Sequence, residues 1–341
     1  MDVAELGGET VEWDGFVHAC PDGTPFHLTA WKRAVEQVFP HRAHYLFARH
    51  AGAIEGVLPL FEVRGLLGGR ALLSVPYAVY AGICARTDEA RRALLDAATR
   101  LAWRLGADHV ELRHQRDQGL GLPTKDRYVA FSREIHPTDE ENLSAIPRKQ
   151  RRMVRQGPKH GLTAAIGMGR HLEECWDVYA ESVRNLGSPV FPRALFAALQ
   201  AAFDKDCQIL TVHREGRVVA GVLTLFHEDR VLPYYGGARR DALPYAVNDF
   251  MYWELMRYAA ATGCRVFDFG RSRVGTGSYH FKRHWGFEPT PLPYQYVLLK
   301  GQGLPDLSPS NPRFDLAIRA WQRLPLPVAN RVGPWLTRYL P

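Results

Sequence analysis

The sequence predicts an α+β protein that contains two copies of one structural unit, each built on a mixed sheet. Two observations support this prediction. The run Gly-Val-Leu-Pro-Leu-Phe at residues 56–61 returns as Gly-Val-Leu-Thr-Leu-Phe at residues 221–226. Each run is followed, in the same order, by an aromatic residue with glycine, a helical stretch and a short strand. Matches that keep one order along the chain indicate an internal duplication.

Each copy is expected to run strand, strand, strand, helix, strand. Short apolar runs bounded by turns indicate the strands, and apolar residues on one face indicate the helices. Asn248 is the expected N-cap of the second helix, and Gly263 is placed to terminate it. The first strands are predicted at residues 44–48 and 208–213, the helices at 88–105 and 248–262, and the closing strands at 109–113 and 265–269.

The first copy is longer than the second, and we place its extra residues in the hairpin around residues 64–70, because surface loops tolerate insertions. Between the copies the chain is mostly helical, with one helix near residues 148–156. The tail is expected to pack on the first domain or to lie on a membrane. The expected domains are residues 1–135, residues 136–302 with a basic helical insert at 138–203, and a Pro-rich amphipathic tail at 303–341.

The composition is that of a globular protein. Of the 341 residues 46% are apolar and 23% are charged, which argues against disorder, and the length favours two domains. The net charge of +7 favours an anionic partner, although solubility alone explains such a charge equally well. Five scattered cysteines, an acidic N-terminus without a signal peptide and the lack of a long apolar stretch predict a cytoplasmic protein.

The stretch after the second copy carries the most specific motif. Residues 267–272 read Phe-Asp-Phe-Gly-Arg-Ser, and residues 279–288 read Tyr-His-Phe-Lys-Arg-His-Trp-Gly-Phe-Glu. This pattern resembles the FemAB family of non-ribosomal peptidyl and aminoacyl transferases, in which a strand ending in Asp-x-Gly precedes a helix with Tyr-x-Phe-Lys. The resemblance implies two tandem GNAT-like domains, which have the acyl-CoA N-acyltransferase fold, and an acyltransferase activity.

Most of the chain shares this resemblance. It is closest to the FemAB-related proteins associated with the PEP-CTERM/exosortase and exopolysaccharide systems of Gram-negative bacteria. The features that carry it are a basic helix at residues 148–155, Gly-x-Pro-x-Phe at residues 187–191 and a tail rich in Asn-Pro and Leu-Pro. The resemblance implies that the acceptor is an amino group of a small-molecule or lipid-linked cell-envelope or exopolysaccharide precursor, with possible peripheral contact with the inner membrane.

A motif that is missing from the sequence bears on the identity of the acyl donor. Related GNAT proteins that use acetyl-CoA carry Gln/Arg-x-x-Gly-x-Gly/Ala before the helix, where backbone N–H groups hold the pyrophosphate. Residues 236–249 lack this spacing, which disfavours acyl-CoA, and the resemblance implies aminoacyl-tRNA instead. No tightly bound cofactor is expected. An acyl-CoA-dependent N-acetyltransferase and a non-catalytic module that binds a nucleotide-sugar or lipid diphosphate stay open as alternatives.

Two residues are candidates for catalysis. Acyl transfer to an amine needs a proton acceptor and a group that stabilises the oxyanion. Lys282 follows a glycine-rich loop on a predicted helix and can hold the oxyanion or the donor's phosphate; the alternative is a solvated helix lysine. Asp268 ends a predicted buried strand and can accept the amine proton or orient Arg271; the alternative is a structural carboxylate.

Two further groups are candidates for binding. Arginine binds phosphate through two parallel hydrogen bonds, so the basic helix suits a diphosphate or a tRNA arm; a solvated charged face is the alternative. For the tyrosines, aromatic core packing is the alternative. The predicted acceptor contacts are Tyr234, Tyr235, Asn248, Arg271, Arg273, Tyr279 and Trp285. The predicted phosphate and donor contacts are Arg148, Lys149, Arg151, Arg152 and Arg155.

Other catalytic classes lack their motifs. His280 and His284 have helical spacing but neither a third ligand nor an HExxH context, so no metal is expected. The sequence has no GxSxG elbow, Walker-type phosphate loop or dinucleotide fingerprint. The simplest mechanism is therefore direct attack of the amine in a ternary complex. The sequence does not indicate an oligomeric state.

Overall fold

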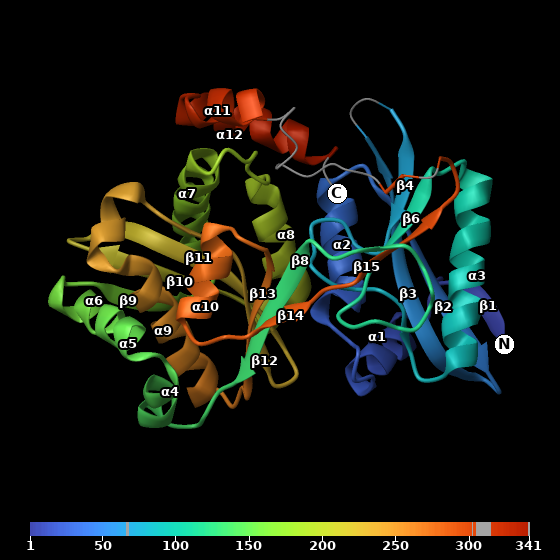
Figure 1. Ribbon diagram of the computed structural model, residues 1–341, viewed down its shortest axis with the longest axis horizontal. Helices are drawn as coiled ribbons and strands as arrows, with labels where there is room; N and C mark the ends of the chain where they lie inside the picture. The colour runs from blue at the N-terminus through green and yellow to red at the C-terminus, as the bar shows by residue number, and fades with distance from the viewer. Residues whose placement is uncertain (66–67, 302, 305–314, 340–341) are drawn as a thin grey trace. The chain divides into compact units, whose positions relative to one another are not determined.

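The computed structural model describes residues 1–65, 68–301, 303–304 and 315–339, which form two compact units (Figure 1). Unit 1 comprises the described residues of 1–129, 291–304 and 338–339, and unit 2 comprises residues 130–290 and 315–337. Each unit is a mixed sheet covered by helices on both faces, which confirms the predicted α+β class.

The sheet of unit 1 has the strand order β1-β2-β3-β4-β6-β15-β7, with β5 added beside β3. Only β4 and β6 pair in parallel among these strands. The strands are β1 (Asp2–Glu5), β2 (Arg42–His50), β3 (Ala53–Arg64), β4 (Arg70–Leu73), β5 (Cys84–Ala85), β6 (His109–Arg113), β7 (Thr124–Lys125) and β15 (Tyr294–Leu298). The helices are α1 (Thr10–Ala19), α2 (Thr29–Val38) and α3 (Asp88–Leu105), with a 3-10 turn at Pro25–His27.

Alternation along β2 explains the two cores of unit 1. Tyr45 points to the side of α1, where its ring lies 5.0 Å from that of Trp13. The next residue, Leu46, belongs to the opposite cluster, which includes Leu94 and Leu101 of α3. Helix α3 begins at an N-cap whose hydroxyl accepts the Ala90 N–H and ends at a left-handed glycine, so its limits match the predicted residues 88–105.

The sheet of unit 2 has the order β14-β8-β13-β12-β11-β10-β9. Its strands are β8 (Tyr128–Glu134), β9 (Thr163–Gly167), β10 (Cys207–Arg214), β11 (Arg217–His227), β12 (Arg230–Ala238), β13 (Val266–Arg273) and β14 (Pro289–Pro291). Its helices are α4 (Asp139–Ala145), α5 (Arg148–Val154), α6 (Gln156–Lys159), α7 (Arg170–Asn185), α8 (Arg193–Phe203), α9 (Val247–Ala261), α10 (Gly277–His284), α11 (Asp315–Gln322) and α12 (Leu326–Thr337), with 3-10 turns at Asp204–Asp206 and Arg240–Tyr245.

The two sheets repeat one topology, as the duplication predicts. In both, four antiparallel strands lead to a parallel pair, β4 with β6 and β12 with β13. The next strand of each sheet comes from the other half of the sequence. Strand β15 pairs with β6 through Tyr294↔Arg113 and Leu298↔His109, and β8 lies beside β13. Residues 291–304 therefore belong to unit 1, whereas the sequence placed them in the second domain.

The extra length of the first copy lies in two places, not in one hairpin. Phe61 pairs with Leu73 across the β3–β4 hairpin, whereas Phe226 pairs with Val231 across the shorter β11–β12 hairpin. The chain then leaves the sheet after Leu73 and rejoins it at β5. Residues 74–83, which we call the inserted segment, have no counterpart in β12, which continues without a break.

The tail helices α11 and α12 contact α7, and the described tail residues 315–337 belong to unit 2. Trp321 Nε1 donates to the carbonyl of Ser188 at 3.0 Å, and Arg184 donates to the carbonyl of Leu324 at 3.1 Å. Within the described residues no helix is both long enough and apolar enough to cross a bilayer.

Candidate functional site

The parallel strands β12 and β13 pair only at their beginnings in the described ladder, at Arg230↔Val266 and Val231↔Phe267. Just beyond this point, the register of β11 and β12 shifts, and Tyr234 is the extra residue of a β-bulge. Bulges are common beside active sites because they re-aim side chains. The later residues of these two strands, together with α10, form the candidate site.

Lys282 of α10 is tied to the end of β13. Its Nζ donates to the carbonyl oxygens of Phe269 at 2.7 Å, Gly270 at 3.3 Å and Arg271 at 3.0 Å. Gly270 has a φ of 64°, which lets the strand turn its carbonyls toward one point. Lys282 therefore holds the end of β13 in shape, a structural role that the sequence did not predict.

The charge of Lys282 reflects two opposing influences. The pKa of this lysine is lowered to about 7, mainly by burial; the guanidinium of Arg271 also lowers the pKa, and the carboxylate of Asp268 opposes them. Three carbonyl acceptors, however, match the three donors of an ammonium group. We assign Lys282 the charged ammonium form, because a neutral amine would turn its lone pair toward one of the three carbonyl oxygens. An oxyanion can accept a hydrogen bond from Lys282 only if one of the three carbonyl oxygens loses its own hydrogen bond.

Asp268 lies inside β13 rather than at its end and is only 3% exposed. Its carboxylate accepts the backbone N–H of Gly270 at 2.8 Å, so it supports the same turn that Lys282 holds. The structure thus brings together three residues selected from the sequence, Asp268, Arg271 and Lys282.

Two of the predicted acceptor contacts lie in the core. Tyr235 packs against the rings of Phe191 and Phe196 at 5.3 and 5.4 Å and is 6% exposed. Trp285 is fully buried, and its Nε1 donates to Asp249 Oδ1 at 2.9 Å. The apolar surfaces of both side chains are already covered within unit 2, so their contact with the acceptor stays a prediction.

The other predicted acceptor contacts are half-buried and keep some access to solvent: Tyr234, Asn248, Arg271, Arg273 and Tyr279. The ring of Tyr279 packs edge-on against Phe131 at 5.5 Å. Asn248 is not the N-cap of α9, because the helix already begins at Val247 after Ala246 in a left-handed conformation. Its amide is therefore not engaged in capping.

The basic helix is short, and its cationic side chains point outward. Arg148, Lys149, Arg152 and Arg155 are exposed and Arg151 is half-buried, and within the described residues none of the five has an acidic partner. The opposite face is buried: Gln150 Nε2 donates to Asp249 Oδ1 at 3.1 Å. Such a cluster of positive charge suits a polyanion.

Asp249 was missed by sequence reasoning. Asp249 is 7% exposed, and its Oδ1 accepts from Trp285, which directly follows α10, and from Gln150 of α5, so it links α9 to both segments. Burial raises its pKa, and these two hydrogen bonds oppose the rise. The sequence did carry a signal for its burial, because Asp249 lies on the same helix face as the apolar residues Trp253 and Met256.

The equivalent place in unit 1 is filled by the inserted segment. The N–H of Ser74 donates to the carbonyl of Glu111, and the guanidinium of Arg113 donates to the carbonyl of Ala78 at 2.8 Å. Arg113 also forms a buried ion pair with Glu111 at 2.7 Å. A cavity of about 10 Å³ remains beside His114, with room for about one water molecule. The candidate site therefore belongs to unit 2.

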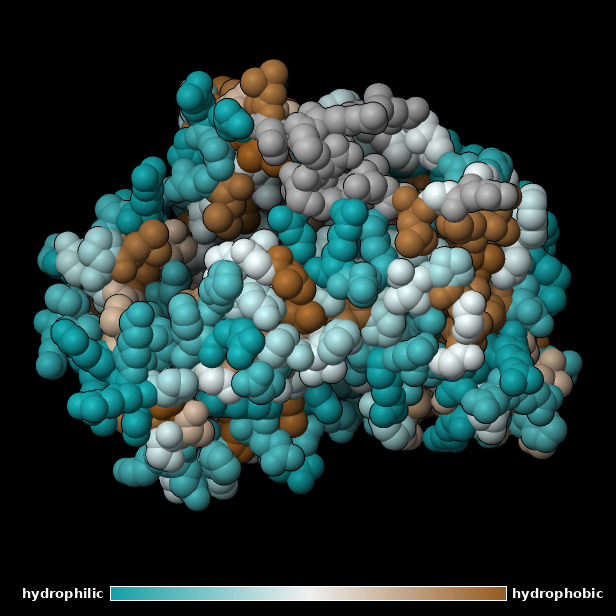
Figure 2. Space-filling view, viewed as in Figure 1, coloured by the Kyte–Doolittle hydropathy of each residue, from teal (hydrophilic) through white to brown (hydrophobic). Residues whose placement is uncertain are grey.

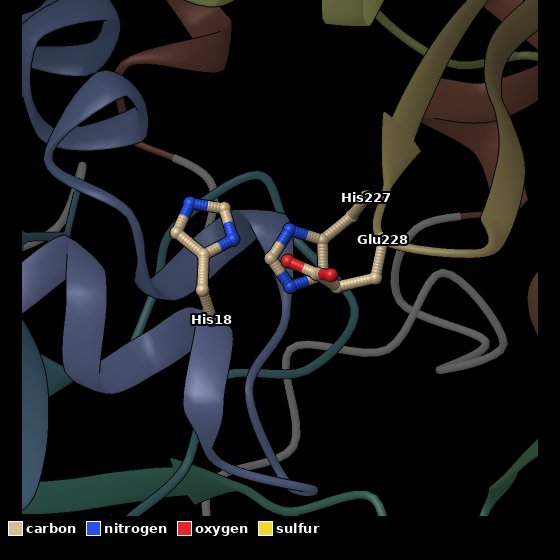
Figure 3. Close-up of side chains that lie close together, drawn as sticks. All are labelled: His18, His227 and Glu228. Carbon is tan, nitrogen blue, oxygen red and sulfur yellow. The ribbon is translucent and has the colours of Figure 1, made fainter.

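Figure 3 draws three further side chains with potential ligand atoms. His227 ends β11 and Glu228 starts the following turn in unit 2, whereas His18 lies on α1 of unit 1. Because the three are divided between the units, we assign no metal site to them. His280 and His284 are both exposed on α10.

Residues 141–283 match the family model described as an acetyltransferase (GNAT) domain. This range contains the basic helix, β12, β13 and Lys282. The lipid II:glycine glycyltransferase of Staphylococcus haemolyticus (strain JCSC1435) is 28% identical over 90 residues, which cover 24% of this chain and 22% of that protein. The chain therefore matches only about a fifth of the length of this curated relative.

Two solved structures share the fold over most of the chain. FemX superposes with a TM-score of 0.67 at 18% identity, over 86% of this chain and 97% of FemX. A tandem GNAT protein from the clavulanic acid biosynthesis pathway gives a TM-score of 0.55 at 11% identity, over 89% and 99% of the two chains. The chain therefore has a tandem GNAT fold, of the kind seen in FemX and in the clavulanic acid pathway protein, and its residues 141–283 match the GNAT acetyltransferase domain model.

Proposed function

We propose that this chain is an N-acyltransferase of the aminoacyl or peptidyl transferase type. The observation that carries the proposal is that the GNAT-domain match at residues 141–283 covers the candidate site of unit 2, where β12 and β13 part beside a bulge. The proposed acceptor is an amino group of a lipid-linked cell-envelope or exopolysaccharide precursor, and the proposed location is the cytoplasm. The relative named as a lipid II glycyltransferase supports a lipid-linked acceptor.

The proposed reaction is direct attack in a ternary complex. The amine loses a proton to Asp268, its nitrogen bonds to the acyl carbon, and the ester C–O bond of the donor breaks as the leaving oxygen takes that proton from Asp268. Lys282 keeps its hydrogen bonds to β13 and stabilises the oxyanion through its charge in a water-poor environment. The half-buried Arg271, Arg273 and Tyr279 are the proposed contacts for the reactants.

The proposed donor is aminoacyl-tRNA. The arginines of α5 point outward and have no acidic partner in the part of the chain that the structure describes, so they suit a phosphate backbone. Acetyl-CoA is disfavoured at the start of α9, where acetyl-CoA-dependent GNAT proteins hold the pyrophosphate. Here the first turn carries the buried carboxyl of Asp249, and any charge on that carboxylate would repel a phosphate.

The PEP-CTERM/exosortase setting is a finer part of the proposal. It rests on the resemblance of Gly187–Phe191, the basic helix and the Pro-rich tail, and it predicts an exopolysaccharide-linked amine as the acceptor. The competing candidate is an acyl-CoA-dependent N-acetyltransferase, which the description of the matching domain family favours.

A donor-binding experiment separates these candidates. The full chain is titrated with bulk aminoacylated tRNA, with the same tRNA after deacylation, and with acetyl-CoA. We expect charged tRNA to bind more tightly than deacylated tRNA, and acetyl-CoA to bind weakly. Saturable acetyl-CoA binding together with equal affinity for the two tRNA samples would reject the aminoacyl donor and favour the acetyltransferase.

A further inference from the structure

The fully buried positions of the tail helix α12 hold small residues, whereas three of its larger apolar side chains are exposed to solvent. Ala329 and Gly333 are buried, and a Cβ added at Gly333 would lie 2.9 Å from the backbone nitrogen of Val190. Val328, Val332 and Trp335 form the opposite face and are 44%, 37% and 47% exposed. A helix that only packs on its own chain would bury the larger apolar residues instead.

Helix α11 and the end of α7 extend this apolar surface. Leu316 on α11 is 80% exposed, and Leu186, directly after α7, is 73% exposed. Gly187, next to Leu186, lies against Ile318 of α11. Figure 2 shows apolar side chains at the top of the view, where α11 and α12 lie in Figure 1. We call Leu186, Leu316, Val328, Val332 and Trp335 the tail face.

The charges beside the tail face have one sign. Arg319, Arg323 and Arg331 are exposed, and within the described residues none of them has an acidic partner. Residues 316–337 contain no aspartate or glutamate. Such a surface would repel a second copy of itself, so a symmetric dimer through this face is disfavoured.

Hydrogen bonds hold the tail face in its outward position. The Trp321 indole donates to the carbonyl of Ser188, and Arg184 donates to the carbonyl of Leu324, so both helices are anchored at the end of α7. The inner face of the tail helices is therefore already packed on unit 2. The outward apolar residues are exposed although the tail helices are bound to the rest of the unit.

We propose that the tail face is a docking surface for an anionic lipid bilayer. Tryptophan and aliphatic side chains insert at the level of the headgroups, and arginines beside them contact lipid phosphates. The tail face combines these residue types in one patch, and the net positive charge complements an anionic leaflet. This inference goes beyond the proposed acyl transfer and stands without it, although it would bring the site to a lipid-linked acceptor.

Flotation of the full chain with vesicles tests the proposal. We expect binding to phosphatidylcholine vesicles that contain phosphatidylglycerol, weak binding to pure phosphatidylcholine, and roughly fivefold weaker binding for each of Arg319, Arg323 and Arg331 changed to Gln. Trp335→Ser should weaken binding at every salt concentration. Equal binding to both kinds of vesicle, or no loss in these variants, overturns the proposal.

Matched controls identify the surface. Trp103→Ser removes a tryptophan that is 60% exposed on α3, and Arg92→Gln/Arg100→Gln/Arg104→Gln removes three exposed charges from the same helix. Both controls should keep vesicle binding. An equal loss of vesicle binding in the α3 variants would show that binding depends on total charge. A dimer that dissociates on Trp335→Ser would assign the tail face to a second copy of the chain. Either result rejects the proposed membrane surface. Acylation of a water-soluble acceptor is measured in parallel and should not change.

Discussion

Lys282 Nζ lies 2.7 Å from the carbonyl oxygen of Phe269, the closest of the three carbonyl groups that it joins at the end of β13. A single cation thus shapes the strand end and also sets the electrostatic potential beside Asp268 and Arg271. The structural and the electrostatic contributions of this side chain are therefore coupled.

Lys282→Met should remove both contributions. We expect the free energy of unfolding to fall by about 2 kcal/mol, because three carbonyl oxygens lose a donor, and turnover to fall by roughly a hundredfold. Arg283→Met, at an exposed site on the same helix, should change stability by less than about 0.5 kcal/mol. Both are measured by urea unfolding and by single-turnover kinetics. Full turnover in folded Lys282→Met would remove this residue from the mechanism.

The basic helix should control the salt dependence of tRNA binding. Arg148→Gln/Arg152→Gln/Arg155→Gln should lower affinity and reduce the slope of log affinity against log salt by roughly 2, because each phosphate contact contributes about 0.7–0.9. The α3 variant Arg92→Gln/Arg100→Gln/Arg104→Gln loses the same charge elsewhere and should keep the slope. Identical slopes in the two triple variants would mean that α5 does not contact the nucleic acid.

Asp249→Asn should change how stability depends on pH. Burial raises the pKa of Asp249, so the folded state holds a proton that the unfolded state releases, and wild-type stability falls as pH rises through the folded pKa. The amide keeps an oxygen acceptor for Trp285 and Gln150 but does not titrate. Relative to the wild type, the variant should gain stability as the pH rises above about 4, the ordinary pKa of an aspartate, until the folded-state carboxyl has lost its proton. Asp241→Asn, at an exposed position, should show no such gain in the same melting experiments.

Gly82→Ala tests the closure of unit 1 by the inserted segment. A Cβ at this position would lie 2.1 Å from Cδ2 of His114, whose ring is buried and accepts the Ile83 N–H at 3.0 Å. We expect a loss of about 1–3 kcal/mol in unfolding free energy from overpacking. Gly15→Ala in α1 meets no atom within 4 Å and should instead stabilise by about 0.5–1 kcal/mol. Urea unfolding of both variants gives the comparison.

Much of the fold could be predicted from the sequence, because its signals act over short distances along the chain. The repeated runs at residues 56–61 and 221–226 lie in β3 and β11, and the helix predicted at residues 88–105 has those limits. The grouping of Asp268, Arg271 and Lys282 also followed from the sequence, since a strand and the next helix bring their side chains together within a few turns.

Only the tertiary structure decided the contacts between distant segments. Tyr235 and Trp285 look like binding residues in the motif, yet each is covered by helices that periodicity cannot place around them. Three further features depend on contacts between segments that are far apart in the sequence. They are the hydrogen bond from Gln150 to Asp249, the exchange of β8 and β15 between the two sheets, and the packing of the tail on α7. Local patterns determined which strands and helices form, whereas the burial of side chains between non-adjacent elements determined which residues remain accessible for chemistry.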